Sequence, residues 1–400
     1  MRLKKIAAIG AAFGVAIAGF GLGAAAHADP VTDGYAVVGS DTLQDAVWAL
    51  TNGTGITGSS VKATGNGSVA ASWDAFTLGV SGGVGSIQTK AFGPVFDRPN
   101  GSGAGRKALL ASFGGTSGSA FTFTTGVNSY NTSPVNIQGQ VDLSRSSSVA
   151  STGATSVAGG VLTYVPFGQD AISFIYKVGS GSASDVTAAT SFVSNLTKAQ
   201  LLSIYTGSST TPISGTAFSV QPMSLQASSG TWKTFLSKIG ISGGVTLGAG
   251  VLGGASNTTT PENDGRVLAP AANTVEIIPV SVANYVGQVN NAARINTFAG
   301  VSVGSIEGVA PFTGTAPNLV PNATYYNSSD WGRTVFIVVR SAALDSTNAA
   351  FDQGVSDLVD TTQTTSLTYW GASALAGTSK AVKAKFGFSA PQTAAFTAND

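Results

Sequence analysis

Cysteine is absent from this 400-residue sequence, and histidine occurs only once, at His27. Without cysteine the chain forms no disulfide, offers no thiolate nucleophile and carries no lipobox cysteine for a lipid anchor. If the segment that contains His27 is removed, as argued below, the mature chain has no histidine either. That excludes Ser-His-Asp catalytic triads and zinc sites with histidine ligands.

Charge is also scarce in this sequence. Only 10% of the residues are charged, with 20 Lys and Arg against 19 Asp and Glu. A nucleic-acid partner would need clustered Lys and Arg, so this balance argues against one. Hydrophobic residues make up 43% of the chain, which is too apolar for a disordered protein. We therefore expect a folded chain.

The N-terminus is typical of a secretory signal peptide. Basic residues within positions 1–5 precede an apolar, Gly/Ala-rich stretch over 6–25, and Ala26-His27-Ala28 fits the small-x-small cleavage rule. We expect a signal peptide over 1–28 and a mature, secreted chain from Asp29. A retained membrane anchor is the alternative. Cleavage removes three of the 20 basic residues and no acidic one, so the mature net charge is 17 minus 19, or −2.

Chain length and the order of elements predict two α/β lobes. Four hundred residues exceed what one compact core usually holds. β-rich and helical stretches alternate, which predicts a largely parallel sheet with ligands at the carboxyl ends of its strands. Segment 161–178 holds two apolar runs broken at Pro166 and Gly168, and we interpret it as a crossing between lobes. Further expected elements are a helix from its N-cap Thr197 through Ile204, a buried strand over 331–339, and helices within 347–361 and 377–386.

The stretch 39–50, GSDTLQDAVWAL, brings a strand to a Gly-Ser turn and starts a helix directly after it. Ser40, Asp41 and Thr42 stand where a helix N-cap would stand. The first amides of a helix have no intrahelical acceptors and carry the positive end of the peptide dipoles, so a small oxyanion can dock there. Ordinary capping is the alternative for a single loop of this kind.

Similar loops recur further along the chain. GSGAG at 101–105 precedes a helix expected over 104–113, and SSGT at 228–231 precedes one expected over 231–239. The GSGAG loop lacks the GxxxxGK[ST] pattern of a nucleotide P-loop. A strand over 138–148 ends in three serines beside Arg145, which is otherwise a solvated turn residue. Together these loops predict amides and hydroxyls that surround one anion.

Several motifs, in order, resemble the extracellular solute-binding proteins of the phosphate-binding type that serve ABC transporters. GSDTLQD resembles the family's opening turn, NGSGAGRKALL its second glycine loop and VDLSRSSS its D-x-x-x-S-[SD] strand end. YVPFGQDAISFIY is similar to the crossing strand, LTKAQLLSIYTG to a family helix and SSGTWKTFL to the S-G-T anion loop. PENDGRVL and NYVGQVNNAARI resemble later segments.

The resemblance implies a periplasmic-binding-protein-like fold, two α/β lobes joined by crossing hinge strands that close on phosphate or a similar oxyanion. It also implies an ABC-transporter permease as partner, a monomer and no cofactor. The expected lobes are 29–170 with 310–400, and 171–309. Carried over by position, the ligand contacts are Asp41, Thr42, Ser102, Ser147, Ser229, Gly230 and Thr231. The loops themselves add Ser40, Gly103, Arg145, Ser146 and Asp264 to the candidate set.

Two positions depart from the family pattern. Ser147 stands where phosphate binders commonly place an Asp that accepts the ligand's proton, and Leu225 stands where they place an Arg. A proton acceptor matters because a carboxylate that faces fully ionised sulfate is repelled and left unpaired. Asp41 or Asp264 could supply the acceptor and Arg145 the guanidinium. Capping for Asp41 and turn structure for Asp264 are the alternatives.

Three functions remain open at this point. The first is a secreted, non-enzymatic protein that captures phosphate or a similar oxyanion. The second is a secreted hydrolase, which without histidine would need one of three glutamates (Glu262, Glu276, Glu307) or Ser229 with Lys233. The third is a surface or adhesion protein that has lost the pocket, and a cleft filled by side chains would favour it.

Overall fold

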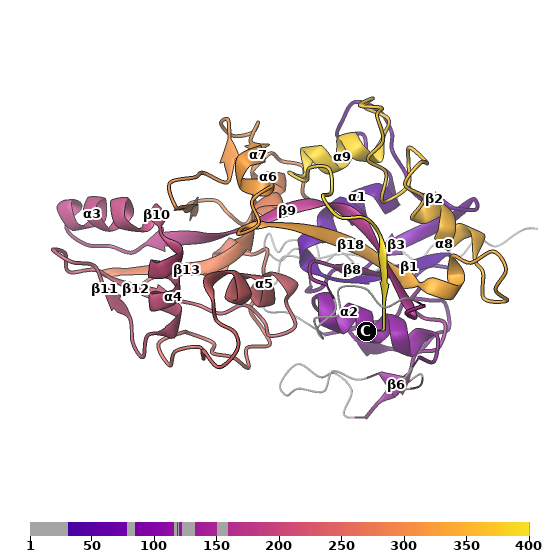
Figure 1. Ribbon diagram of the computed structural model, residues 1–400, viewed down its shortest axis with the longest axis horizontal. Helices are drawn as coiled ribbons and strands as arrows, with labels where there is room; N and C mark the ends of the chain where they lie inside the picture. Colours follow the sequence, from indigo (N-terminus) through magenta and orange to yellow (C-terminus); the bar gives the residue numbers. More distant parts are fainter. Residues whose placement is uncertain are drawn as a thin grey trace, which may run out of the picture.

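A computed structural model describes residues 31–77, 85–115, 118, 120–121, 133–149 and 159–399. The expected signal peptide, 1–28, lies outside these residues. Within them, no helix has the length and apolar character needed to cross a membrane. Figure 1 shows two bodies joined by long strands, with α3, α4 and α5 in one body and α1, α2 and α8 in the other.

One sheet runs through both bodies in the order β11-β12-β13-β9-β18-β8-β1-β3-β2, and β14 and β19 also pair with β9. Its strands in the first body are β1 (Tyr35–Gly39), β2 (Thr64–Gly65), β3 (Ser68–Ser72), β8 (Leu143–Ser146), β18 (Gly332–Arg340) and β19 (Phe396–Ala398). β9 (Leu162–Val178) crosses into the second body, which adds β11 (Thr211–Pro212), β12 (Ser219–Pro222), β13 (Thr274–Ser281) and β14 (Ser302–Val303).

Helices and short paired strands complete the described chain. The helices are η1 (Asp41–Leu43), α1 (Gln44–Asn52), α2 (Ser102–Ser112), α3 (Ala183–Val193), α4 (Lys198–Thr206), α5 (Gly230–Ile239), η3 (Gly265–Val267), α6 (Val282–Val289), α7 (Ala323–Tyr326), η4 (Ser341–Ala343), α8 (Gln353–Leu358) and α9 (Ser379–Lys385). The short strand pairs are β4 (Ser86–Ile87) with β5 (Phe96–Asp97), β6 (Ala120–Phe121) with β7 (Val135–Asn136), β10 (Asn195–Leu196) with β15 (Ser305–Ile306), and β16 (Phe312–Thr313) with β17 (Val320–Pro321).

The crossing segment is one strand rather than two broken runs. β9 continues for 17 residues through Pro166 and Gly168. Its register with β18 shifts between Val335 and Phe336, where Gly168 and Pro166 face successive partners. A bulge of this kind absorbs an extra residue and tolerates a proline that has no N–H to donate. The expected interruption is therefore a bulge, and the strand is continuous between the two bodies.

The expectation of a largely parallel sheet is wrong for the crossing strands. β1 is parallel to β3 and β8, and β12 is parallel to β13. β9, however, is antiparallel to β13, β14, β18 and β19. The chain crosses between the bodies more than once, so the strands that cross run against each other. Each body keeps a parallel unit, and β1 and β8 end side by side at the edge where Ser40 and Ser147 follow them.

The buried side chains form separate cores in the two bodies. One core lies around the second half of β9, β13, α4 and α5. In the other body, the two faces of β1 contribute to different cores, Val37 to one and Val38 to the other. We call the body around β1, β8 and α1 the first lobe and the body around β12, β13 and α5 the second lobe. The two-lobed α/β fold is confirmed, while the residue boundaries of the lobes stay a prediction.

Candidate functional site

Residues from the predicted anion loops lie together between the lobes. The Oγ1 atoms of Thr42 and Thr231 are 3.2 Å apart, although 189 positions separate them in the chain. Ser102 Oγ lies 3.1 Å from Ser147 Oγ. A Cβ atom placed on Gly230 would lie 2.4 Å from the Ser147 hydroxyl and 2.6 Å from the Ser102 hydroxyl. The helix starts of α2 and α5 and the turn at η1 therefore meet with little space between them.

Local capping positions the first and third loops. Ser40 is the N-cap of η1 and accepts the Thr42 N–H at 3.2 Å. Ser229 is the N-cap of α5 and accepts the Trp232 N–H at 2.9 Å. The capping alternative is thus true for Ser40 and Ser229, because one hydroxyl can accept from its own helix and donate to a further group.

Arg145 does not direct its guanidinium at the anion site, as the sequence had suggested. Its side chain is fully buried and donates to four main-chain carbonyl oxygens and one hydroxyl, at distances from 2.6 to 3.3 Å. The acceptors belong to Val37, Gly39, Ser40, Ser72 and Trp73. All five N–H donors are used in this way. Arg145 therefore stabilises the main chain around Ser40 through these hydrogen bonds. The alternative, that Arg145 is a solvated turn residue, is wrong as well.

Ser146 and Gly103 are also directed elsewhere. Ser146 Oγ accepts from Arg106 Nη1 at 2.9 Å and donates to the Ser148 carbonyl oxygen at 2.7 Å. Successive strand side chains point to opposite faces, which explains why Ser146 faces away while Ser147 faces the cluster. The Gly103 amide is 3.5 Å from the Ser228 carbonyl oxygen, so it contributes to contact between the lobes.

Ser147 joins the loops of the first lobe to one another. Its N–H donates to Ser102 Oγ at 2.9 Å, and its hydroxyl lies 3.0 Å from Ser40 Oγ. Serine is a donor as well as an acceptor, whereas an ionised Asp at this position would only accept. The departure from the family pattern therefore replaces a fixed negative charge with a neutral hydroxyl.

Glu262, which was not among the predicted contacts, occupies the centre of the cluster. Its Oε1 accepts the Thr42 N–H at 2.9 Å, the Thr42 hydroxyl and, at 3.3 Å, the Ser40 hydroxyl. Its Oε2 accepts the Ser229 hydroxyl and, at 3.4 Å, the Thr231 N–H. Only 2% of Glu262 is exposed. A carboxylate of the chain itself thus receives the donors that were expected to hold an external oxyanion.

Asp41 lies against Glu262 and affects its charge. Asp41 Oδ2 accepts the Glu262 N–H at 2.9 Å. Burial and the neighbouring Glu262 carboxylate raise the pKa of Asp41 well above its usual range. Burial alone would raise the pKa of Glu262 too, but the Asp41 carboxyl, the Arg333 charge and the hydroxyls of Ser229 and Thr42 together lower it. Of the two carboxyls, Asp41 is therefore the one that is more readily protonated.

Arg333 and Asp170 were also absent from the predicted set. Arg333 Nη2 is 2.7 Å from Thr231 Oγ1 and 3.3 Å from Thr42 Oγ1, while Nη1 donates to the Ser147 carbonyl oxygen at 3.1 Å. Asp170 Oδ2 accepts from Arg333 Nε and Nη2 at 3.0 and 2.8 Å. The available signal was a carboxylate in the middle of the apolar strand β9 and an arginine near the start of β18, because buried charges are usually paired.

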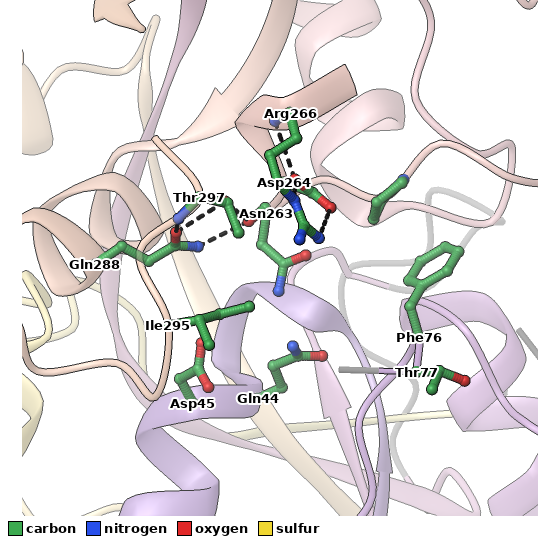
Figure 2. Close-up of a pocket in the computed structure, with 11 residues that line it drawn as sticks. Gln44, Asp45, Phe76, Thr77, Asn263, Asp264, Arg266, Gln288, Ile295 and Thr297 are labelled. Atoms are coloured by element: carbon green, nitrogen blue, oxygen red, sulfur yellow. Dashed lines mark hydrogen bonds and ion pairs between the residues drawn. The ribbon is translucent and has the colours of Figure 1, made fainter. Parts of the chain in front are cut away.

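Asp264 does not reach the cluster. It pairs with Arg266 at 2.5 Å and caps η3, so the turn alternative is correct for this residue. Figure 2 shows the pair on one side of a small pocket and Gln44 and Asp45 of α1 on the other. The pocket volume, about 30 Å³, is room for roughly one water molecule. Leu225, the second departure from the family pattern, is buried in the core of the second lobe.

The arrangement suits anion binding better than hydrolysis or metal binding. The Ser229 hydroxyl already donates to Glu262 and caps its own helix, and Lys233 donates its main-chain N–H to the Ser229 carbonyl oxygen, as helical neighbours do. Among the described residues, no group of three or more His, Cys, Asp or Glu is placed to hold a metal ion. Amides, hydroxyls and one guanidinium instead surround a single buried negative charge.

Comparisons with known proteins agree with the fold. No protein-family model and no curated protein matches this sequence. The chain is similar to a proposed phosphate ABC transporter substrate-binding protein with bound phosphate from Clostridium perfringens, with a TM-score of 0.45 and 14% identity over 82% of this chain and 94% of that chain. It is similar to an ABC-type phosphate transport receptor from Vibrio cholerae (TM-score 0.40, 15% identity, 78% and 89%) and to a high-affinity periplasmic phosphate-binding protein bound with phosphate (0.43, 18%, 90% and 91%). This chain is thus similar in structure to solved proteins that are described as phosphate-binding or as phosphate transport receptors.

Proposed function

We propose that this protein is a secreted, non-enzymatic solute-binding protein. It captures inorganic phosphate or a similar small oxyanion between its lobes, acts as a monomer and delivers the anion to an ABC-transporter permease. One observation carries the proposal: donors of Thr42 from the first lobe and of Ser229 and Thr231 from the second converge on one buried carboxylate. Two carboxylate oxygens are close substitutes for two oxygens of a tetrahedral oxyanion.

The charges around the cluster favour a small, desolvated anion. Arg333 is the cation that contacts the site hydroxyls, and Asp170 already balances its charge. Attraction therefore rests mainly on helix-start amides and hydroxyls, as in other anion sites at helix N-termini. Such donors replace the hydration shell of a small anion but offer nothing to a large or cationic solute. This supports phosphate, sulfate or molybdate as the ligand class.

Calorimetric titration of anion-stripped protein with phosphate, sulfate and molybdate tests the proposal. We expect binding of at least one of these anions at a single site. Thr42→Val should weaken it about tenfold or more, because it removes a hydroxyl that donates to the charge in the site. Thr187→Val is the matched control, since Thr187 is exposed and donates only to the Ala183 carbonyl oxygen. Absence of heat with every anion, in the wild type and in the Glu262 variants described below, would contradict the proposal.

A specific observation favours a second candidate, a secreted surface or adhesion protein without an anion pocket. Glu262 fills the centre of the cluster, and filling of the cleft by a side chain is what this alternative expects. Leu225, buried in place of a cationic residue, is consistent with it. Removal of the Glu262 carboxylate distinguishes the two candidates. In an anion-binding protein it frees the donors and should strengthen anion binding. In a scaffold protein without a pocket it should produce no anion binding.

A further inference from the structure

We infer that Glu262 is a tethered competitor of the anion: it occupies the donors itself, holds the lobes closed without ligand, and lets in only an oxyanion that displaces it. This inference rests on the proposed function and adds to it a residue that sets the affinity and the choice of anion.

The donor geometry gives the first argument. Thr42 contributes an amide and a hydroxyl, Ser40 and Ser229 contribute hydroxyls, and Thr231 contributes an amide, and all five are directed at the two Glu262 oxygens. An external oxyanion placed among the same donors would find each of them occupied. It would also lie beside a second negative charge in a buried site, which is strongly unfavourable. Carboxylate and anion therefore exclude each other.

The position of Glu262 in the chain gives the second argument. The residue lies on the turn that precedes η3 in the second lobe, yet its Oε1 accepts from Thr42 and its N–H donates to Asp41, both in the first lobe. Its Oε2 accepts from Ser229 of the second lobe. One side chain thus makes the contacts across the cleft that a bound ligand makes in a hinged binding protein.

The surroundings of the turn give the third argument. Asn263 is held by Gln288 Nε2 at 2.7 Å and by Thr297 Oγ1 at 3.1 Å, so the main chain next to Glu262 is anchored within the second lobe. The pocket beside it, which Figure 2 shows, has a volume of only about 30 Å³. The donors that Glu262 accepts from belong to both lobes, so its side chain links them. We therefore expect the release of Glu262 to accompany separation of the lobes.

The consequence is a measurable loss of apparent affinity. If the free protein spends most of its time closed on Glu262, the apparent dissociation constant rises by the inverse of the fraction that is open. Anions that bind the donors no better than a carboxylate fail to enter. Removal of the carboxylate should raise affinity, which is the opposite of what removal of a ligand-contacting residue does.

Three variants test the inference by calorimetry with inorganic phosphate and sulfate. We expect Glu262→Ala to bind phosphate about tenfold or more tightly than the wild type. Glu262→Gln, which keeps the size but removes the charge, should fall between them. Glu307→Gln is the matched control, because Glu307 is exposed and accepts only the Lys198 N–H, and it should equal the wild type. Small-angle X-ray scattering should show anion-free Glu262→Ala more open than the wild type and closed again with phosphate.

The outcomes separate this inference from the proposed function. If Glu262→Ala and Glu262→Gln bind phosphate as tightly as the wild type or more weakly, Glu262 is no competitor, while the binding function stands. If the wild type and both variants unfold cooperatively but bind none of the anions, the competitor and the binding function are both overturned. Should Glu262→Ala fail to fold, Glu262→Gln carries the same comparison, since the amide preserves the packing of the side chain.

Discussion

Arg333 and Asp170 lie directly opposite each other on the antiparallel strands β18 and β9, joined by hydrogen bonds of 2.8 and 3.0 Å. Asp170 also accepts the Ala283 N–H at the start of α6 at 3.0 Å. The pair fixes the guanidinium where it reaches the hydroxyls of Thr42 and Thr231. The strands that join the lobes therefore also carry a cation that contacts the site hydroxyls.

Removal of one partner of this pair should be costly. Asp170→Asn leaves a buried guanidinium without its carboxylate, and we expect a loss of about 3–5 kcal/mol in the free energy of unfolding. The double variant Asp170→Asn with Arg333→Met should recover part of that loss. Urea unfolding measures both. Lys198→Met serves as control, because the side chains of Lys198 and Asp330 are 43% and 58% exposed and their pair should contribute under about 1 kcal/mol. Equal losses for D170N and K198M would refute the ranking.

Gly230 limits how closely the lobes approach. A Cβ atom there would lie 2.4 Å from Ser147 Oγ and 2.6 Å from Ser102 Oγ, so Gly230→Ala should hold the lobes apart. We expect a larger radius of gyration by small-angle scattering and phosphate binding weakened by about tenfold or more, since the donors no longer converge. Gly55→Ala is the matched control, because nothing lies within 4 Å of its added methyl group. A G230A protein as closed as G55A would disprove the expectation.

Arg145 should matter for binding without contact to the ligand. Arg145→Met removes the donors that the guanidinium gives to four buried carbonyl oxygens, and we expect a loss of at least about 3 kcal/mol in the free energy of unfolding. Phosphate affinity should fall as well, because the Ser40–Thr42 loop loses its support. Denaturant unfolding and calorimetry give the two values. Arg340→Met is the comparison, since Arg340 lies over the Phe113 ring instead of under the loop, and it should leave the affinity unchanged.

Asp41 should make the stability of the folded protein fall as pH rises above the pKa of an unfolded Asp carboxyl. Its folded-state pKa is raised, by burial first and by Glu262 second. A carboxyl with a raised folded-state pKa contributes its full stabilisation below the unfolded pKa and loses it as pH rises through the folded pKa. Asp41→Asn keeps an acceptor for the Glu262 N–H and has no proton to lose. The free energy of unfolding of D41N should therefore increase relative to that of the wild type as pH rises. Urea unfolding of both proteins across a pH series measures this difference. Parallel curves for the two proteins would exclude a protonated Asp41.

Local structure was predictable because its signals are local. Capping by Ser40 and Thr197 follows from hydroxyl side chains placed before apolar, helix-spaced residues, and both cap as expected. The helix expected from Thr231 begins one residue earlier, at Gly230, and Ser229 is its cap. The continuity of β9 was harder to predict, because a proline and a glycine normally interrupt a strand unless a bulge in the partner register accommodates them.

The sequence by itself determined which segments form strands, turns and capped helices, and that several of those turns offer donors to an anion. The tertiary structure decided which side chains face the shared cleft. Arg145 and Asp264 stand in plausible motifs, yet neither reaches the site. Arg145 donates to main-chain carbonyl oxygens of the Ser40 loop, and Asp264 forms an ion pair with Arg266. Glu262 lies in the segment PENDGRVL, where only Asp264 was singled out as a candidate contact, and yet Glu262 receives the donors of both lobes. The physical reason is that a hydrogen bond between residues 220 positions apart depends on how two lobes close, and no local pattern of residue types records that distance.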